Sequence, residues 1–215
     1  MDKTSAENLV SQAFNYPFNQ SKYSELISNI FKVSVKSELN VIPISEKFKD
    51  IVSNIKIYSN YSDTKSKKID ALEIELHDNV SFNKSRYIQR NIATDYLKKN
   101  NCDAVLISFY NKKGLDWRLS LITREVNSHI DKKGNIKVQI NTSPIKRLSY
   151  LVGQNEPNFT AKTQVINLLL NKNNTLDDIK NAFNLEKVTD EFFEDYKKHY
   201  LNLSKKIDKM IKNDN

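Results

Sequence analysis

The sequence predicts an α/β (α+β) fold in which a central mixed sheet is crossed by one helix and followed by a helical C-terminal segment. Segments of alternating apolar and polar residues, typical of strands, fill the middle of the 215-residue chain. A helical pattern over residues 83–99 separates two of these strands, as in a crossover connection. After a turn-rich stretch near residue 153, the remaining apolar patterns have helical spacing. We therefore expect an α/β domain over residues 1–152 and a helical segment over residues 153–215.

The first elements follow from periodicity. Residues 21–32 carry apolar side chains at helical spacing, and Ser21 suits the N-cap of this helix. Residues 51–60 and 68–77 alternate apolar and polar side chains, so each is expected to be a strand with one polar face. The polar segment between them favours an antiparallel pair.

The next elements complete the expected sheet. Residues 83–99 have one apolar stripe and predict a helix. Residues 103–110 are nearly all apolar, which indicates a strand covered on both faces. Residues 116–127 and 136–142 predict further strands, with a glycine-containing turn at 131–135 between them.

The C-terminal part predicts three helices. The first covers residues 159–171, and the second starts at Thr175, which with Asp178 resembles a capping box. The third begins at Thr189, with acidic residues in its first turn. Its apolar stripe comprises Phe192, Tyr196, Tyr200, Leu203, Ile207 and Ile211.

Composition indicates a folded protein of the reducing cytoplasm. Hydrophobic residues make up 39% of the chain, and only 3 glycines and 4 prolines argue against a low-complexity sequence. No apolar run of ~18 residues predicts a membrane span, and the N-terminus lacks the apolar core of a signal peptide. The single cysteine, Cys102, excludes an internal disulfide and is expected to be a buried structural thiol.

The positive charge is concentrated in the middle of the chain. The net charge is +8; residues 80–100 hold five basic and one acidic group, and residues 111–150 hold nine and three. Such a region favours a polyanion such as DNA. A lysine- and asparagine-rich composition is also typical of AT-rich genomes, which is the simpler explanation.

A set of basic and amide side chains in this region is the candidate DNA-binding surface. Arg86 and Arg90 are the strongest members, because both lie on one helix face and the arginine fork suits phosphate. For each residue, ordinary solvated charge competes with this role, and Arg90 could instead pair with Glu73 or Glu75. The full set comprises Lys84, Arg86, Gln89, Arg90, Arg118, Lys146 and Arg147.

The order helix, hairpin, acidic strand, helix, strand resembles the metal-dependent nuclease fold built around an Asp…Glu-x-Lys motif. Asp70, Glu73 and Glu75 would supply carboxylates for Mg²⁺ in such a site. The lysine is missing, since Glu75 follows two residues after Glu73, and His77 two after Glu75. Alternatively, these side chains alternate along the solvent face of a strand and have no catalytic role.

The residues exclude a methyltransferase centre within this chain. Gly114, Gly134 and Gly153 are too widely spaced to form a glycine-containing loop for S-adenosylmethionine, and no Asn/Asp-Pro-Pro-aromatic motif is present. The three histidines are far apart in sequence and form no ligand pattern for zinc. No cofactor is therefore expected here, apart from Mg²⁺ in the nuclease case.

Three stretches resemble the N-terminal region of type II, IIG-like restriction–modification proteins. They are AFNLEKVTDEFFEDYKKHYL at 182–201, DAVLISFYNKKGLDWRLSLI at 103–122 and KRLSYLVGQNEPNF at 146–159, with QRN at 89–91. The resemblance covers about Phe14 to Leu203. It rests on family-specific sequence stretches rather than on a catalytic motif.

In that family this region precedes a DNA adenine methyltransferase that uses S-adenosylmethionine, and some relatives also cleave DNA. The resemblance implies a fragment whose partners are DNA and the methyltransferase domain of its parent chain. Its role would be DNA engagement or packing. The alternatives are a Mg²⁺-dependent endonuclease domain and a protein–protein interaction module, so whether the fragment is itself an enzyme stays open.

Overall fold

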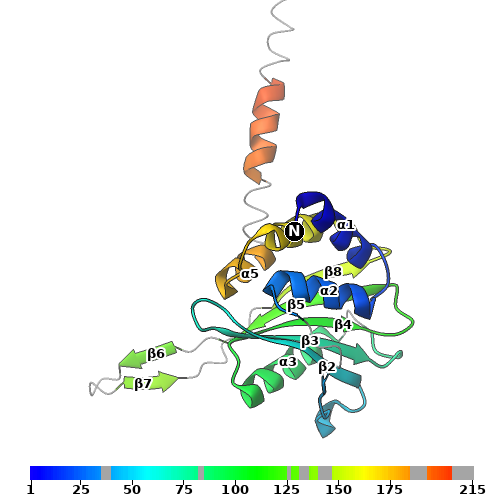
Figure 1. Ribbon diagram of the computed structural model, residues 1–215, viewed down its shortest axis with the longest axis vertical. Coiled ribbons are helices and arrows are strands. Elements are labelled where there is room, and N and C mark those ends of the chain that lie inside the picture. The colour runs from blue at the N-terminus through cyan, green and yellow to red at the C-terminus, as the bar shows by residue number, and fades with distance from the viewer. Residues whose placement is uncertain are drawn as a thin grey trace, which may run out of the picture. The chain divides into compact units, whose positions relative to one another are not determined.

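A six-stranded mixed sheet forms the centre of the unit Met1–Phe183 (Figure 1). The computed structural model describes residues 1–34, 40–81, 85–124, 127–130, 136–139, 147–184 and 193–204. The strands, in their order across the sheet, are β1 (Asn40–Val41), β2 (Val52–Ser62), β3 (Lys68–Leu76), β4 (Ala104–Tyr110), β5 (Asp116–Thr123) and β8 (Arg147–Gly153). Neighbouring strands are antiparallel except β3 and β4, which are parallel. The α/β class with a mixed sheet is therefore confirmed.

Helices cover both faces of the sheet. The parallel pair is joined by α3 (Arg86–Asn100), which packs on one face with its own apolar cluster. The four helices α1 (Lys3–Phe14), α2 (Gln20–Phe31), α4 (Phe159–Leu170) and α5 (Leu176–Phe183) share the opposite face. Figure 1 shows α1, α2 and α5 on the side of the sheet away from α3. A short 3₁₀ turn, Glu46–Phe48, precedes β2.

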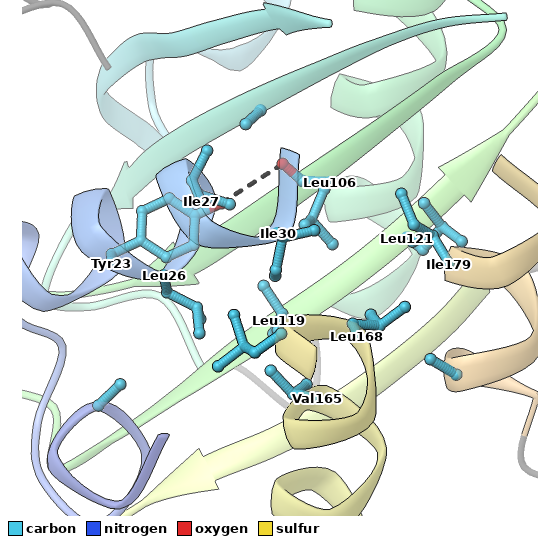
Figure 2. Close-up of a cluster of buried hydrophobic side chains, with 14 of the residues drawn as sticks. Tyr23, Leu26, Ile27, Ile30, Leu106, Leu119, Leu121, Val165, Leu168 and Ile179 are labelled. Atoms are coloured by element: carbon cyan, nitrogen blue, oxygen red, sulfur yellow. Dashed lines mark hydrogen bonds between the residues drawn. The ribbon is translucent and has the colours of Figure 1, made fainter. Parts of the chain in front are cut away.

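The larger core lies under the four helices. Side chains of α2, α4 and α5 converge on β4 and β5 in Figure 2. Tyr23 is buried in this layer, where its hydroxyl donates to the Leu72 carbonyl at 2.9 Å and lies 3.4 Å from the Leu106 carbonyl. Trp117 is 1% exposed and meets Phe14 edge-on at 5.6 Å. This apolar burial is the main stabilising contribution to the unit.

Local caps fix the helix starts. The Asp2 side chain accepts the Ser5 N–H at α1, and the Asn19 side chain accepts the Lys22 N–H at α2. The cap of α2 is thus Asn19 rather than the expected Ser21, because Asn19 has the extended backbone that an N-cap requires.

The elements α1, β1, β8 and the 3₁₀ turn had no counterpart in the expected set. The strand β6 (Asn127–Ile130) was not expected either, whereas β7 (Ile136–Gln139) falls within the strand expected at 136–142. These two strands form a separate two-stranded antiparallel sheet. The unit continues through α4 and α5 because α4 packs on α1 and α5 packs on β8. The compact unit therefore extends beyond the change in composition near Gly153.

The remaining described residues, 193–204, form a helix in a second unit. Its exposed apolar side chains include Phe193, Tyr200 and Leu203. The expected start at Thr189 and the stripe residues Phe192, Ile207 and Ile211 lie outside the described residues. In the described parts of the chain, no helix is both long enough and apolar enough to span a membrane.

Candidate functional site

Glu73 is buried at the centre of a hydrogen-bond network on the face covered by the four helices. It is 1% exposed, so the expected solvent-facing row of acidic residues on β3 is wrong. Its carboxylate accepts hydrogen bonds from the Tyr58 hydroxyl and, at 2.6 Å, from the Tyr110 hydroxyl. Lys56, opposite Glu73 on β2, completes the network with an ion pair of 3.3 Å. Burial, followed by the adjacent carboxylate, raises the pKa of both tyrosines, so both stay protonated donors.

Glu75 lies on the same face, one pleat nearer the end of β3. Its carboxylate accepts from the Ser53 hydroxyl at 3.1 Å and pairs with Lys112 at 3.2 Å. An open pocket borders it, lined by Asp50, Ser53, Glu75, Leu76, His77, Asp78, Asn79 and Lys112. The carboxylates of Glu73 and Glu75 thus both have hydrogen-bond and ion-pair partners, which are side chains of β2, β4 and the turn after β4.

Asp70 does not join these two carboxylates. Successive side chains of a strand point to opposite faces, and Asp70 points toward α3. There it accepts from the Tyr96 hydroxyl at 2.8 Å and the Cys102 thiol at 3.2 Å. The expected convergence of Asp70, Glu73 and Glu75 therefore does not occur. Among the residues that the structure describes, no three His, Cys, Asp or Glu side chains form a group suited to a metal ion.

The start of α3 presents a basic and aromatic surface. Arg86 is exposed, Tyr87 is 65% exposed, and Arg90 is half-buried. The Arg90 guanidinium lies 5.3 Å from the centre of the Tyr87 ring, within the range of a cation–π contact. The alternative pairing of Arg90 with Glu73 or Glu75 is wrong, because those carboxylates lie on the other face and pair with lysines.

Gln89 is fully buried between these arginines. Its side-chain amide donates to the Ser85 hydroxyl at 2.8 Å. Its side chain turns toward the sheet with Ile92 and Ala93, so it holds the start of α3 rather than facing a base edge. The expected DNA contact of Gln89 therefore has no structural basis.

Arg118 lies on β5 and is 5% exposed. Its Nη1 donates weakly to the Ser149 hydroxyl at 3.4 Å, and its Nε and Nη2 have no partner in the described part of the chain. Burial, then the charge of Arg86, lowers the pKa of Arg118 to about 10, against a smaller opposing effect of Glu156. Arg118 is therefore still a cation at neutral pH.

The other predicted DNA contacts cannot be placed at this surface. Lys84 and Lys146 lie outside the described residues, and Arg147 begins β8 with its side chain outside them. Sequence reasoning missed Lys56, Tyr58 and Tyr110 as partners of Glu73. The two strands were recognisable, but only the register that places Lys56 opposite Glu73 identifies this pair.

Comparison with protein-family models, with curated proteins and with solved structures finds no match to this chain.

Proposed function

We propose that the chain is the N-terminal part of a type II, IIG-like restriction–modification protein and that its α/β unit engages DNA with the start of α3. The observation that carries the DNA contact is the pair of exposed side chains Arg86 and Tyr87 with the half-buried Arg90 one turn further along the same helix. The family assignment is supported by the three resembling stretches in the sequence. In this proposal, adenine methylation from S-adenosylmethionine belongs to a methyltransferase domain of the parent chain.

Each side chain of this set has a role that its chemistry supports. Arg86 and Arg90 offer planar forks of N–H donors that match phosphate oxygens, and such contacts position a duplex without reading its sequence. The Tyr87 ring is exposed beside them and offers a surface for sugar or base stacking. Binding through phosphates is strongly dependent on salt.

The test is binding of the full chain to a DNA duplex over a salt series. We expect Arg86→Ala with Arg90→Ala to weaken binding and to reduce the slope of log K against log salt by about 1.8, because each phosphate contact contributes about 0.9. The matched control is Lys98→Ala with Lys99→Ala, which removes the same charge at the other end of α3. Equal effects of the two double variants would show that only net charge matters and would refute a site at the start of α3.

The same experiment with Mg²⁺ tests the nuclease alternative. The observation in its favour is that Glu73 and Glu75 share one face of β3 and that Glu75 borders an open pocket. Nicking that requires Mg²⁺ and disappears in Glu75→Ala would support this alternative. Nicking that persists in Glu75→Ala would assign the cleavage to another site or to a contaminant.

Packing against the methyltransferase domain is the second contribution we propose for the chain. Phe193, Tyr200 and Leu203 expose apolar surface along helix 193–204, which is unusual for a helix that functions alone in water. Adding the separately produced methyltransferase domain would protect this helix from proteolysis. Unchanged cleavage in its presence would refute the contact.

A further inference from the structure

Arg118 is a buried cation that forms no ion pair with any acidic side chain among the described residues. In the part of the chain that the structure describes, its guanidinium has one long hydrogen bond, to Ser149, and two nitrogens without partners. Arginine stays charged even when buried, and an uncompensated buried charge is strongly destabilising. Buried donors are nearly always satisfied in folded proteins. Two unpartnered nitrogens on one buried guanidinium therefore point to a ligand that accepts hydrogen bonds and carries negative charge.

The position of Arg118 in the sheet defines the site. Trp117 and Leu119 pack under the four helices, so the alternation of β5 directs Arg118 to the α3 face. Arg118 lies opposite Phe109, the penultimate residue of β4. Because β3 and β4 are parallel, both end at this edge, and α3 begins there after β3. The guanidinium is thus placed toward the start of α3.

The surroundings favour an anion. Among charged groups, the like charge of Arg86, the first residue of α3, has the largest effect on the pKa of Arg118, and it lowers this pKa. Glu156 attracts Arg118 but forms no ion pair with it within the described residues. The N-terminus of a helix carries the positive end of its dipole, and α3 begins at Arg86, next to this edge of the sheet. Two arginines and a helix N-terminus concentrate positive potential at one place.

We propose that Arg118 and Arg86, with the first turn of α3, bind a phosphate group between them. Arg118 would donate from Nε and Nη2, which are two parallel donors of the kind that match a tetrahedral oxyanion. The inference rests on the proposed DNA engagement, in which this group is a backbone phosphate held deeper than the contacts of Arg90. Free inorganic phosphate presents the same chemistry and is the probe for the site.

The first test measures thermal unfolding of the full chain with inorganic phosphate against chloride at equal ionic strength and pH. Phosphate that binds the folded chain stabilises it by RT ln(1 + c/Kd), where c is the phosphate concentration, so its Tm rises with the logarithm of c once c exceeds Kd. We expect this rise in the wild type and in Lys98→Met, and its loss in Arg118→Met. An equal rise in Arg118→Met would overturn the proposal.

A second variant keeps the test decisive if Arg118→Met does not fold. Arg86 is exposed, so Arg86→Met is expected to keep the fold. It should weaken phosphate binding about tenfold, the effect of one lost charge-assisted hydrogen bond. Unchanged phosphate affinity in Arg86→Met would contradict a site shared by the two arginines.

Competition separates this inference from the proposed function. In the wild type, phosphate should inhibit duplex binding more strongly than chloride at the same ionic strength. In Arg118→Met, the two salts should inhibit duplex binding equally. Phosphate binding without any duplex binding would leave the site standing and refute DNA engagement. Duplex binding that is lost in the Arg86 and Arg90 variant but shows no phosphate competition would refute the site alone.

Discussion

Asp63 joins the turn between β2 and β3 to the start of α5, and we expect Asp63→Ala to lower the free energy of unfolding by about 3–5 kcal/mol. Its Oδ1 accepts the N–H groups of Lys65 and Lys67, both at 2.8 Å. Its Oδ2 accepts the N–H of Leu176, 113 residues away, also at 2.8 Å. A hydrogen bond to a charged group contributes about 1.5–3 kcal/mol. In the variant the two turn N–H groups can bond to water, so the expected destabilisation is smaller than the sum over three such hydrogen bonds. The Leu176 N–H is buried and loses its partner.

Asp63→Asn is the sharper variant because it keeps the shape. Its single oxygen can serve the turn or Leu176 but not both, so we expect a loss of roughly 2 kcal/mol. Burial alone would raise the pKa of the Asp63 carboxyl, but the N–H donors of Leu176, Lys67 and Lys65 outweigh burial and hold the pKa below its usual value. The stability that results is complete above the unfolded pKa of about 3.9 and is lost as pH falls through the folded pKa. The advantage of wild type over Asp63→Asn should therefore shrink below about pH 4.

Urea unfolding followed by Trp117 fluorescence measures these differences, because the single tryptophan is buried in the core. The control is Asp177→Asn, an exposed acid of the same region that pairs with Lys65 at 2.6 Å and should contribute much less. The reasoning would be refuted if Asp63→Ala were no more destabilising than this control. It would also be refuted if the advantage over Asp63→Asn were the same at pH 7 and at pH 3.

Two further predictions concern the packing of the unit. Gly153 has a φ of +139°, and an added Cβ would lie 2.5 Å from the Leu115 carbonyl oxygen, so Gly153→Ala should lower the unfolding free energy by about 3 kcal/mol. Gly114→Ala should have a smaller effect, because its closest obstacle is the movable Asn111 side chain; equal losses would contradict this reasoning. Burial, followed by the Asp70 carboxylate, raises the pKa of the Cys102 thiol to about 12. Labelling of the native chain with Ellman's reagent at pH 8 should therefore be at least about a hundredfold slower than in urea, and similar rates would show an accessible thiol.

Elements with a long regular pattern could be predicted from the sequence. The apolar stripe of residues 83–99 and the continuous apolar run of 103–110 gave α3 and β4 to within a few residues. The pattern of Leu148, Tyr150 and Val152 in β8 has only three alternating positions, too few to separate a strand from one turn of helix.

The environment of β3 could not be predicted, because it depends on contacts distant in sequence. Alternating Glu73 and Glu75 indicated a solvent face, yet both carboxylates are buried, and Tyr58 and Tyr110 donate hydrogen bonds to Glu73. The expected site of three carboxylates overlooked the alternation of β3, which puts Asp70 on the face of α3, beside Tyr96 and Cys102. At α3, helical spacing identified the exposed Arg86, but the burial of Gln89 follows from how the helix is rotated on the sheet.

The packing of α1 on α4 sets the order in which the chain can complete its fold during synthesis. Ala6, Leu9 and Val10 belong to the same apolar cluster as Val165 and Leu168. The part of α1 that packs on α4 therefore stays uncovered until about 150 further residues have been synthesised, at roughly 5–20 residues per second. During that interval the hairpin of β2 and β3 can form from local contacts, while α1 stays exposed and open to capture by a chaperone. The closing step of the unit is the arrival of α5, when Leu176 meets a turn made more than a hundred residues earlier.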